Sequence, residues 1–181
     1  MNSKPPIRVR DATDSDLPAV HAIYAHHVLY GLATFEETPP TVTVMAERRQ
    51  TILDLGLPYL VAEIDGTVVG HAHVVPYRAR PAYCNSVENT VYVTNGMDGR
   101  GVGSALLGQL IARYEAGPWR QMLAVIGDSG NTGSIALHRR FGFRPVGTLE
   151  AVGFKLGRWV DTVLMQRSLG TGSATPPDKA R

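Results

Sequence analysis

The fold of this chain is decided by the stretch from Ser86 to Arg113, SVENTVYVTNGMDGRGVGSALLGQLIAR. Its β-branched and aromatic residues between Val87 and Val93 predict a mostly buried strand. Farther along, apolar residues recur at helical spacing, at Leu106, Leu107, Leu110 and Ile111. A glycine-rich turn, GRGVG, stands between the two segments. The stretch therefore predicts a strand, a turn and a helix in immediate succession.

The glycine-rich turn is a candidate anion site. A helix start leaves backbone N–H groups without partners and carries a partial positive charge. Glycines at 99, 101 and 103 permit a positive φ and let a phosphate approach the backbone, and Arg100 adds a cation. Leu106 stands where a dinucleotide fingerprint needs a small residue, and no Gly-Lys-Ser/Thr triplet follows. On the turn alone, glycines that serve only the change of direction are an equal alternative.

Length and composition predict one soluble enzyme domain. The chain has 181 residues, is 44% hydrophobic and carries a net charge of +2, too slight to indicate a nucleic-acid or membrane partner. Cys84 is the single cysteine, which excludes an intrachain disulfide and favours a reducing, cytoplasmic setting. Met1 to Pro6 lacks the apolar core of a signal peptide, so we expect none, and no apolar run reaches membrane-spanning length. We expect a domain over residues 1–168 and a disordered tail over 169–181.

The order of expected elements predicts a mixed α/β sheet with helices on both faces. Strands are expected near 7–10, 59–64, 68–75, 86–93, 122–126, 143–150 and 159–166, and helices near 13–29, 42–55 and 131–140, with a long helix from the glycine-rich turn to the break at Gly117-Pro118. Asp65-Gly66 is a strong hairpin signal between two of the strands. The phosphate site then lies at the carboxyl end of the central strand, where open α/β sheets usually bind ligands.

Five further motifs accompany the turn: Thr34-Phe35-Glu36, Tyr77-Arg78-Ala79-Arg80 with Tyr83, Ser86-Val87-Glu88 through Val93, Val125-Ile126-Gly127, and Gly153-Phe154-Lys155-Leu156-Gly157-Arg158-Trp159. Together they resemble the GNAT N-acetyltransferases over roughly residues 7–168, with the closest likeness to the phosphinothricin and methionine sulfoximine acetyltransferase branch. The resemblance implies a mixed, mostly antiparallel GNAT sheet, acetyl-CoA as co-substrate and a homodimer. Asp98 departs from it, because the family's pyrophosphate loop has Arg or Gln there; its effect on CoA binding is left open.

The resemblance also implies binding residues. For the cofactor these are Val91, Tyr92, Val93, Gly99, Arg100, Gly101, Val102, Gly103, Ser104, Asn131 and Ser134, with the main chain of 91–93 holding the pantetheine arm beside a splay or bulge in the sheet. For the acceptor they are Phe35, Arg78, Arg80, Tyr83, Tyr92, Gly127 and Lys155, the last reaching the anionic end of the substrate. On the residues alone, a packed loop aromatic is an equal alternative for Phe35, and solvated loop charges are the favoured alternative for the arginines. For Lys155 the alternative is a surface loop, and the sequence alone does not choose.

Two residues are candidates for proton transfer. An amine that attacks a thioester directly must be neutral, so the site needs a base. Glu88 interrupts an apolar strand and shares a face with Thr90 and Tyr92, where burial raises a carboxyl pKa; a strand-end acid paired with an arginine is the alternative. By resemblance His138 returns a proton to the leaving thiolate, although a lone helical histidine is more often structural.

Other reactive residues indicate no separate chemistry. His71 and His73 share a strand face and His26 and His27 are adjacent, yet no further ligand has metal-site spacing, so we expect no metal. Cys84 lies near Glu88 but has no histidine locally paired with it, which disfavours a covalent route.

The expected function is acetyl-CoA-dependent N-acetylation, by direct attack, of the α-amine of a small amino-acid analogue such as phosphinothricin, methionine sulfoximine or methionine sulfone. The partner is thus a small-molecule amine. Two alternatives are a protein or peptide N-terminal acetyltransferase and a non-catalytic CoA-binding sensor. A peptide enzyme needs an open groove, whereas paired arginines favour a small anionic acceptor.

Overall fold

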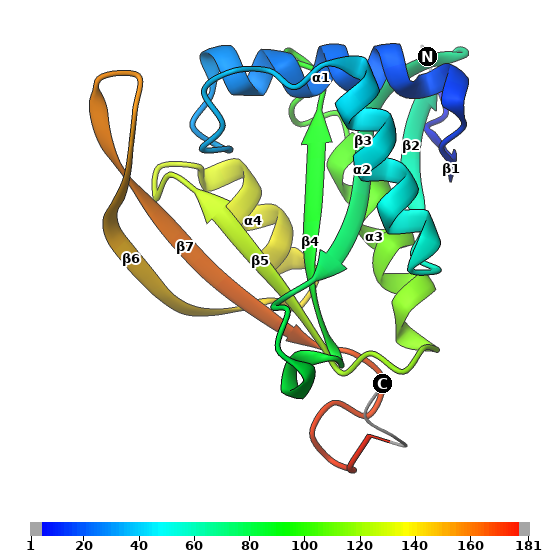
Figure 1. Cartoon of the computed structure of the whole chain (residues 1–181), viewed down its shortest axis with the longest axis vertical. Helices are drawn as coiled ribbons and strands as arrows, with labels where there is room; N and C mark the ends of the chain where they lie inside the picture. The colour runs from blue at the N-terminus through cyan, green and yellow to red at the C-terminus, as the bar shows by residue number, and fades with distance from the viewer. Residues whose placement is uncertain (1–4, 178–181) are drawn as a thin grey trace.

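Seven strands form one sheet in the computed structural model, which describes residues 5–177 (Figure 1). The strands are β1 (Arg8–Asp11), β2 (Tyr59–Ile64), β3 (Thr67–Pro76), β4 (Ser86–Val93), β5 (Gln121–Gly127), β6 (Arg144–Lys155) and β7 (Arg158–Ser168). Their order across the sheet is β1-β2-β3-β4-β5-β7-β6. Every neighbouring pair is antiparallel except β4 and β5, which are parallel. The mixed, mostly antiparallel sheet predicted from the sequence is confirmed.

Helices cover both faces of this sheet. They are α1 (Leu17–Tyr30), α2 (Val42–Asp54), α3 (Val102–Glu115) and α4 (Thr132–Arg140), with short 3-10 turns at Asp14–Asp16 and Pro81–Tyr83. On one face, the ring of Tyr92 from β4 meets Tyr24 of α1 at 5.1 Å. On the other, α3 lies so close to β3 that a Cβ at Gly70 would stand 3.0 Å from Leu106. Alternation along the strands therefore separates an α1 face from an α3 face.

Helix α3 contributes several fully buried side chains to the core. Leu106, Leu107 and Leu110 have no exposed surface, and they pack with buried strand residues such as Val87 and Met122. Full burial of one such side chain contributes about 1.5–3 kcal/mol. The helical spacing that identified this segment in the sequence is thus the spacing that anchors it to the sheet. None of the helices within residues 5–177 has the length and apolar character to cross a bilayer.

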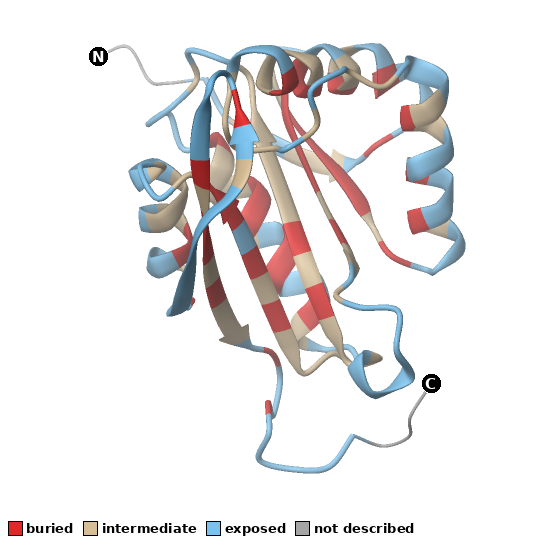
Figure 2. Cartoon of the chain, turned by 60° about the vertical axis from the view of Figure 1, so that its left-hand side comes forward, coloured by how far each residue is buried: buried red, intermediate tan, exposed pale blue. Residues whose placement is uncertain are grey.

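The stretch Gly153–Trp159 differs from the loop expected there. Strand β6 continues to Lys155, and a two-residue turn at Leu156 and Gly157, with φ of 51° and 76°, leads directly into β7. Two-residue hairpin turns of this kind require positive φ at both positions, for which leucine gives no signal. The β6–β7 hairpin therefore projects as a long arm that is exposed over most of β6 (Figure 2).

The expected tail is only partly described. Leu169 is buried, and the amide of Gly170 donates to Glu115 over 2.8 Å, so the start of the tail packs against the end of α3. Arg120 donates to the hydroxyl of Thr175 over 3.3 Å. Residues 178–181 of the predicted disordered segment lie outside the described residues.

Histidines are stacked beneath α1. The ring of His73 on β3 stacks on Tyr59 of β2 at 4.6 Å, and His71 Nδ1 lies 3.2 Å from the Tyr59 hydroxyl. Burial lowers the pKa of His73 to about 4, with a further lowering from the charge of Arg48. Burial also lowers the pKa of His71, assisted by His73 and His27. Over residues 5–177, no group of three or more His, Cys, Asp or Glu side chains is arranged to hold a metal.

These histidines predict an acid-sensitive fold. In the unfolded chain they protonate near pH 6.5, whereas the folded chain keeps them neutral to a lower pH, so the unfolded state binds more protons between these values. Stability should be full above about pH 6.5 and fall as the pH drops towards 4. Thermal melts at several pH values test this: His73→Phe should flatten the profile, and His21→Asn, outside the cluster, should leave it unchanged. An equally steep profile in His73→Phe would contradict the explanation.

Candidate active site

The site begins where β4 and β5 separate. The two strands pair from Ser86 opposite Gln121 to Asn89 opposite Ala124, and no farther. Beyond that point the facing edges of 90–93 and 125–127 have no strand partner, because β3 and β7 pair with the outer edges. A cavity of about 680 Å³ occupies the opening. The splay that the resemblance implies beside residues 91–93 is thus present.

The glycine-rich turn closes one end of this cavity. Gly99 and Gly101 have φ of 69° and 94°, and Gly101 is the residue that caps α3. No side chain within residues 5–177 caps the helix start, so its first backbone N–H groups are available to a ligand. The cavity is lined here by Met97, Asp98, Gly99, Gly101, Val102, Gly103 and Ser104. The arrangement is suited to a phosphate group, with the carboxylate of Asp98 beside it.

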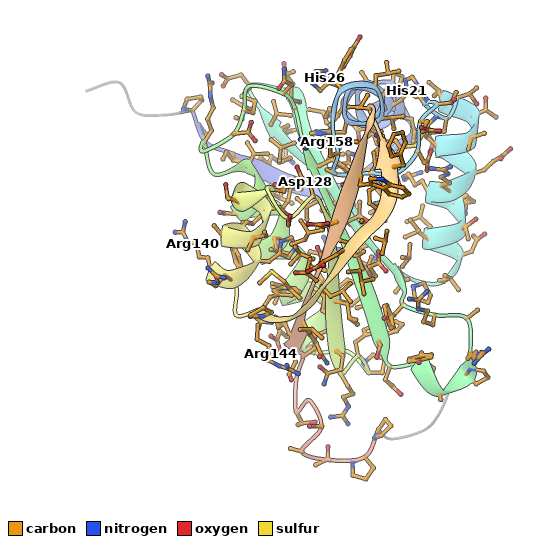
Figure 3. The ribbon with its side chains drawn as sticks, turned by 90° about the vertical axis from the view of Figure 1, so that its left-hand side faces the viewer. His21, His26, Asp128, Arg140, Arg144 and Arg158 are labelled. Carbon is orange, nitrogen blue, oxygen red and sulfur yellow. The ribbon has the colours of Figure 1, made fainter. Side chains whose placement is uncertain are left out.

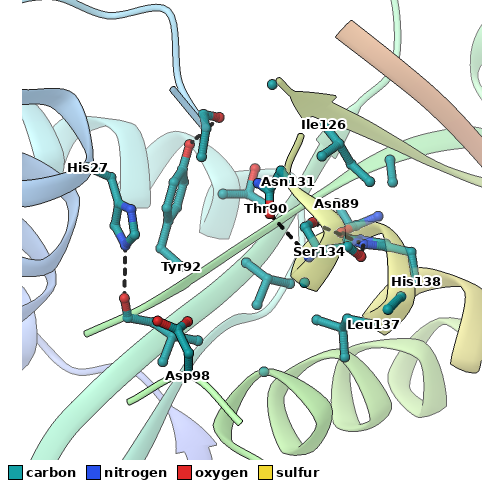
Figure 4. A pocket seen from close by; sticks show the side chains of 18 of the residues that line it. His27, Asn89, Thr90, Tyr92, Asp98, Ile126, Asn131, Ser134, Leu137 and His138 are labelled. Carbon is teal, nitrogen blue, oxygen red and sulfur yellow. Dashed lines mark hydrogen bonds between the residues drawn. The ribbon is translucent and has the colours of Figure 1, made fainter. Parts of the chain in front are cut away.

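Helix α4 forms the wall on the α3 face (Figure 4). Asn131 caps the helix by accepting from the Ser134 amide over 3.2 Å. His138 is buried; its Nδ1 lies 2.8 Å from the Ser134 carbonyl oxygen, and its Nε2 lies 3.0 Å from Asn89 Oδ1. Burial lowers the pKa of His138, while the hydrogen bond to Ser134 acts in the opposite direction. Because both oxygens are acceptors, the ring satisfies both at once only when both nitrogens carry protons.

Glu88 lines the same cavity from the α1 face of β4. The side chain is half-buried, and no hydrogen bond or ion pair to it is present within residues 5–177. Burial raises its pKa above the ordinary value of 4.5, and the positive charge of Arg78 partly offsets this effect. A carboxylate with a raised pKa and no bound partner can accept a proton from a ligand.

The loop after α1 supplies the remaining wall. Ala33, Thr34 and Phe35 line the cavity, and the Tyr92 hydroxyl donates to the Ala33 carbonyl oxygen over 3.3 Å. Gly127, at the end of β5, gives this loop room, since a Cβ there would lie 2.3 Å from the Leu32 carbonyl oxygen. The cavity thus runs from an uncapped helix start, past two facing strand edges, to an isolated carboxylate.

Comparison with known proteins shows the family to which the chain belongs. The family model described as the acetyltransferase (GNAT) domain matches residues 9–164. The chain belongs to the GNAT acetyltransferase family. It is 55% identical to phosphinothricin N-acetyltransferase of Alcaligenes faecalis over 94% of this chain and 86% of the relative. It is 38% identical to L-methionine sulfoximine/L-methionine sulfone acetyltransferase of Pseudomonas aeruginosa over 93% and 98% of the two chains.

Among solved structures, a GNAT superfamily phosphinothricin acetyltransferase from Sinorhizobium meliloti, in complex with acetyl-CoA, superposes with a TM-score of 0.92. It is 46% identical, and the match covers 96% of this chain and 94% of that one. The GNAT fold expected from the sequence is therefore confirmed. The protein is an enzyme of the N-acetyltransferase type.

Most of the site residues predicted for a GNAT enzyme border the cavity. They are Phe35, Glu88, Val91, Tyr92, Val93, Gly99, Gly101, Val102, Gly103, Ser104, Gly127, Asn131, Ser134 and His138. Glu88 and His138 approach from opposite faces of the sheet, which only the opening between β4 and β5 makes possible. Strand alternation predicted the position of Glu88 and Tyr92 on one face.

Five predicted residues do not line the cavity: Arg78, Arg80, Tyr83, Arg100 and Lys155. Arg78 lies over the Tyr77 ring at 4.9 Å and influences Glu88 only through its charge. Arg80 and Tyr83 are exposed in the β3–β4 connection, and Arg100 is exposed on the turn. The side chain of Lys155 is buried against main-chain carbonyl groups instead of reaching into the cavity.

Several other residues line the cavity that were not among the predicted site residues, among them His27, Thr34, Asn89, Thr90, Met97, Arg140 and Thr162. His27 Nε2 donates to the Val93 carbonyl oxygen over 2.8 Å, across 66 residues of sequence. Strand alternation turns Asn89 away from Glu88, so alternation alone does not indicate it as a site residue. Arg140 lies in the last turn of α4 with His138 and Arg139, and nothing in that run of basic residues marked it as a lining residue.

Proposed function

We propose that this GNAT enzyme transfers the acetyl group of acetyl-CoA, by direct attack, to the α-amine of phosphinothricin, methionine sulfoximine or methionine sulfone. The observation that carries the proposal is the single cavity of about 680 Å³ that joins the uncapped start of α3 to the isolated Glu88 carboxylate. Relatives that act on these amino-acid analogues share up to 55% of the sequence and favour this acceptor class.

Acetyl-CoA is assigned to the glycine-turn end. The backbone N–H groups at the start of α3 bind the pyrophosphate, and Asn131 and Ser134 face the pantetheine arm. That arm lies along the unpaired edge of Val91–Val93, whose main-chain groups replace a strand partner. Arg140 lines the cavity, so it is a cation available to a bound phosphate there, whereas Arg100 does not line it.

Glu88 is assigned as the base. Its raised pKa brings proton affinity closer to neutral pH, and it takes the proton from the ammonium form of the acceptor directly or through water. The neutral amine then attacks the thioester carbon, the C–S bond breaks to release the thiolate of CoA, and the remaining extra proton on the nitrogen passes to that thiolate or to water as the amide forms. His138 as the proton donor to that thiolate stays a prediction, because the ring must first release either Asn89 or Ser134.

The acceptor is assigned to the end lined by Phe35, Tyr92 and Gly127. Arg78 is close enough to affect the pKa of Glu88, so it is the arginine best situated to attract an acceptor anion. Arg80 and Tyr83 would contribute only if the β3–β4 connection moved towards the cavity. We therefore rank them below Arg78 as acceptor contacts.

Thiol release from acetyl-CoA tests this function. Phosphinothricin, methionine sulfoximine and methionine sulfone should each be turned over, and common amino acids and short peptides much less. Faster turnover of peptides would favour N-terminal acetylation of proteins. Acetyl-CoA binding without thiol release from any amine would favour a non-catalytic sensor and refute the proposal.

The role of Glu88 predicts a pH effect. Glu88→Gln should lower kcat by roughly 100-fold or more while leaving acetyl-CoA affinity little changed. In the parent enzyme the rate should fall as the pH drops through the raised pKa of Glu88, because protonation removes the base, and this limb should vanish in Glu88→Gln. Steady-state kinetics from pH 5 to 9 measure both effects. An equal loss of acetyl-CoA binding would instead mean that Glu88 is structural.

The expected homodimer is supported by the end of the β6–β7 arm. Phe154, Leu156 and Trp159 are all more than half exposed there, and covering them would remove apolar surface from water. Sedimentation equilibrium should therefore give twice the chain mass. Trp159→Glu should shift the enzyme towards monomer, whereas Arg144→Glu at the other end of β6 should not. A monomeric parent enzyme would contradict this assignment.

A further inference from the structure

Lys155 is a buried cation that the chemistry above does not use. It is the last residue of β6, and its side chain is 2% exposed although its neighbours at the end of the arm face solvent. The ammonium donates to the Thr34 carbonyl oxygen over 2.8 Å and lies 3.5 Å from that of His27. Figure 3 shows the hairpin running from Arg144 to the end that carries Arg158. That end meets α1 and the loop that follows it.

The position of the Lys155 ammonium is favourable for binding main-chain carbonyl groups. His27 lies in the last turn of α1, where carbonyl groups carry partial negative charge and a cation is favourable. Burial lowers the pKa of Lys155, while Glu37 and Glu36 act in the opposite direction. Because Lys155 does not line the cavity, it has no path to an acceptor in this arrangement.

The loop that Lys155 holds is the cavity wall formed by residues 33–35. Two glycines let this loop pack closely: a Cβ at Gly127 would collide with Leu32, and a Cβ at Gly153 would lie 2.9 Å from the Phe35 ring. The Thr34 hydroxyl adds a hydrogen bond of 3.0 Å to Tyr24. The β6–β7 arm thus contacts this wall at two points: Gly153 packs against the Phe35 ring, and Lys155 donates to the Thr34 carbonyl oxygen.

We propose that Lys155 is a positioning residue for the acceptor: it fixes residues 33–35 against the cavity and does not itself touch the substrate. The proposal rests on the acceptor end assigned above. Removing the ammonium leaves the Thr34 carbonyl oxygen without its donor and frees Phe35 to move. Acceptor binding should weaken, while acetyl-CoA, held at the other end of the cavity, should bind as before.

Lys155→Met tests this with a side chain of similar length and no charge. The KM for the acceptor should rise by about tenfold, the size expected when a hydrogen bond to a charged group is lost, with little change in kcat or in the KM for acetyl-CoA. Arg144→Met, which removes an exposed cation from the same strand, should change none of these three constants. Gly153→Ala, which displaces the Phe35 ring without touching Lys155, should reproduce the rise and serves if Lys155→Met folds poorly.

A second comparison separates positioning from direct contact. Methionine sulfone and its carboxamide differ in the acceptor carboxylate, and phosphinothricin adds an anionic side chain. A loss of equal size for all three supports positioning. A loss of acceptor binding that is confined to acceptors with a carboxylate, or to phosphinothricin with its anionic side chain, would mean that Lys155 binds that anion itself. This result would overturn the proposal.

Hydrogen exchange gives a readout that needs no acceptor. Amides of residues 31–37 should exchange faster in Lys155→Met and Gly153→Ala than in the parent or in Arg144→Met, with β2 unchanged in all four proteins. Unchanged exchange in both variants would overturn the proposal whether or not the proposed acceptors are turned over. Faster exchange in an enzyme that is inactive towards every acceptor would leave the anchor in place and refute only the proposed function.

Discussion

The structure depends on a parallel pair of strands that stops pairing half-way. β4 and β5 share a ladder only to Asn89 and Ala124, and an open ladder end exposes backbone groups that need partners. Side chains provide some of them: Asn89 Nδ2 donates to the Leu123 carbonyl oxygen over 2.8 Å, and His27 donates to that of Val93. His138 in turn holds Asn89, so Leu123, Asn89 and His138 are joined by hydrogen bonds where the ladder ends.

This opening is what allows chemistry in the middle of a sheet. In a continuous sheet, side chains on opposite faces are separated by the backbone layer. Here Glu88 from the α1 face and His138 from the α3 face border one cavity, and the uncapped start of α3 lies at its end. A long ligand can therefore run along one strand edge while its reactive end meets groups from both faces. The place where β4 and β5 stop pairing therefore provides both the ligand-binding edge and the access of proton-transferring side chains from both faces.

The second organising feature is the β6–β7 arm. Its outer end is apolar and exposed at Phe154 and Trp159, yet the adjacent Lys155 is buried on the wall of the cavity. Any contact that covers the end of the arm thus lies one residue from the anchor of the acceptor wall. An alternating strand explains this, because successive side chains point to opposite faces.

Local patterns in the sequence determined much of this protein. Helical spacing at Leu106, Leu107 and Leu110, positive-φ glycines in the turn and period-two alternation around Glu88 each act over a few residues, so they predicted the elements, the anion site and the α1 face. Only the tertiary structure decided which residues form hydrogen bonds with one another in the site. Asn89 with His138, His27 with Val93 and Lys155 with Thr34 join residues 49, 66 and 121 positions apart. No local pattern specifies such contacts, because they arise from how helices pack on the two faces, which turned Lys155 away from the cavity and left Arg100 outside it.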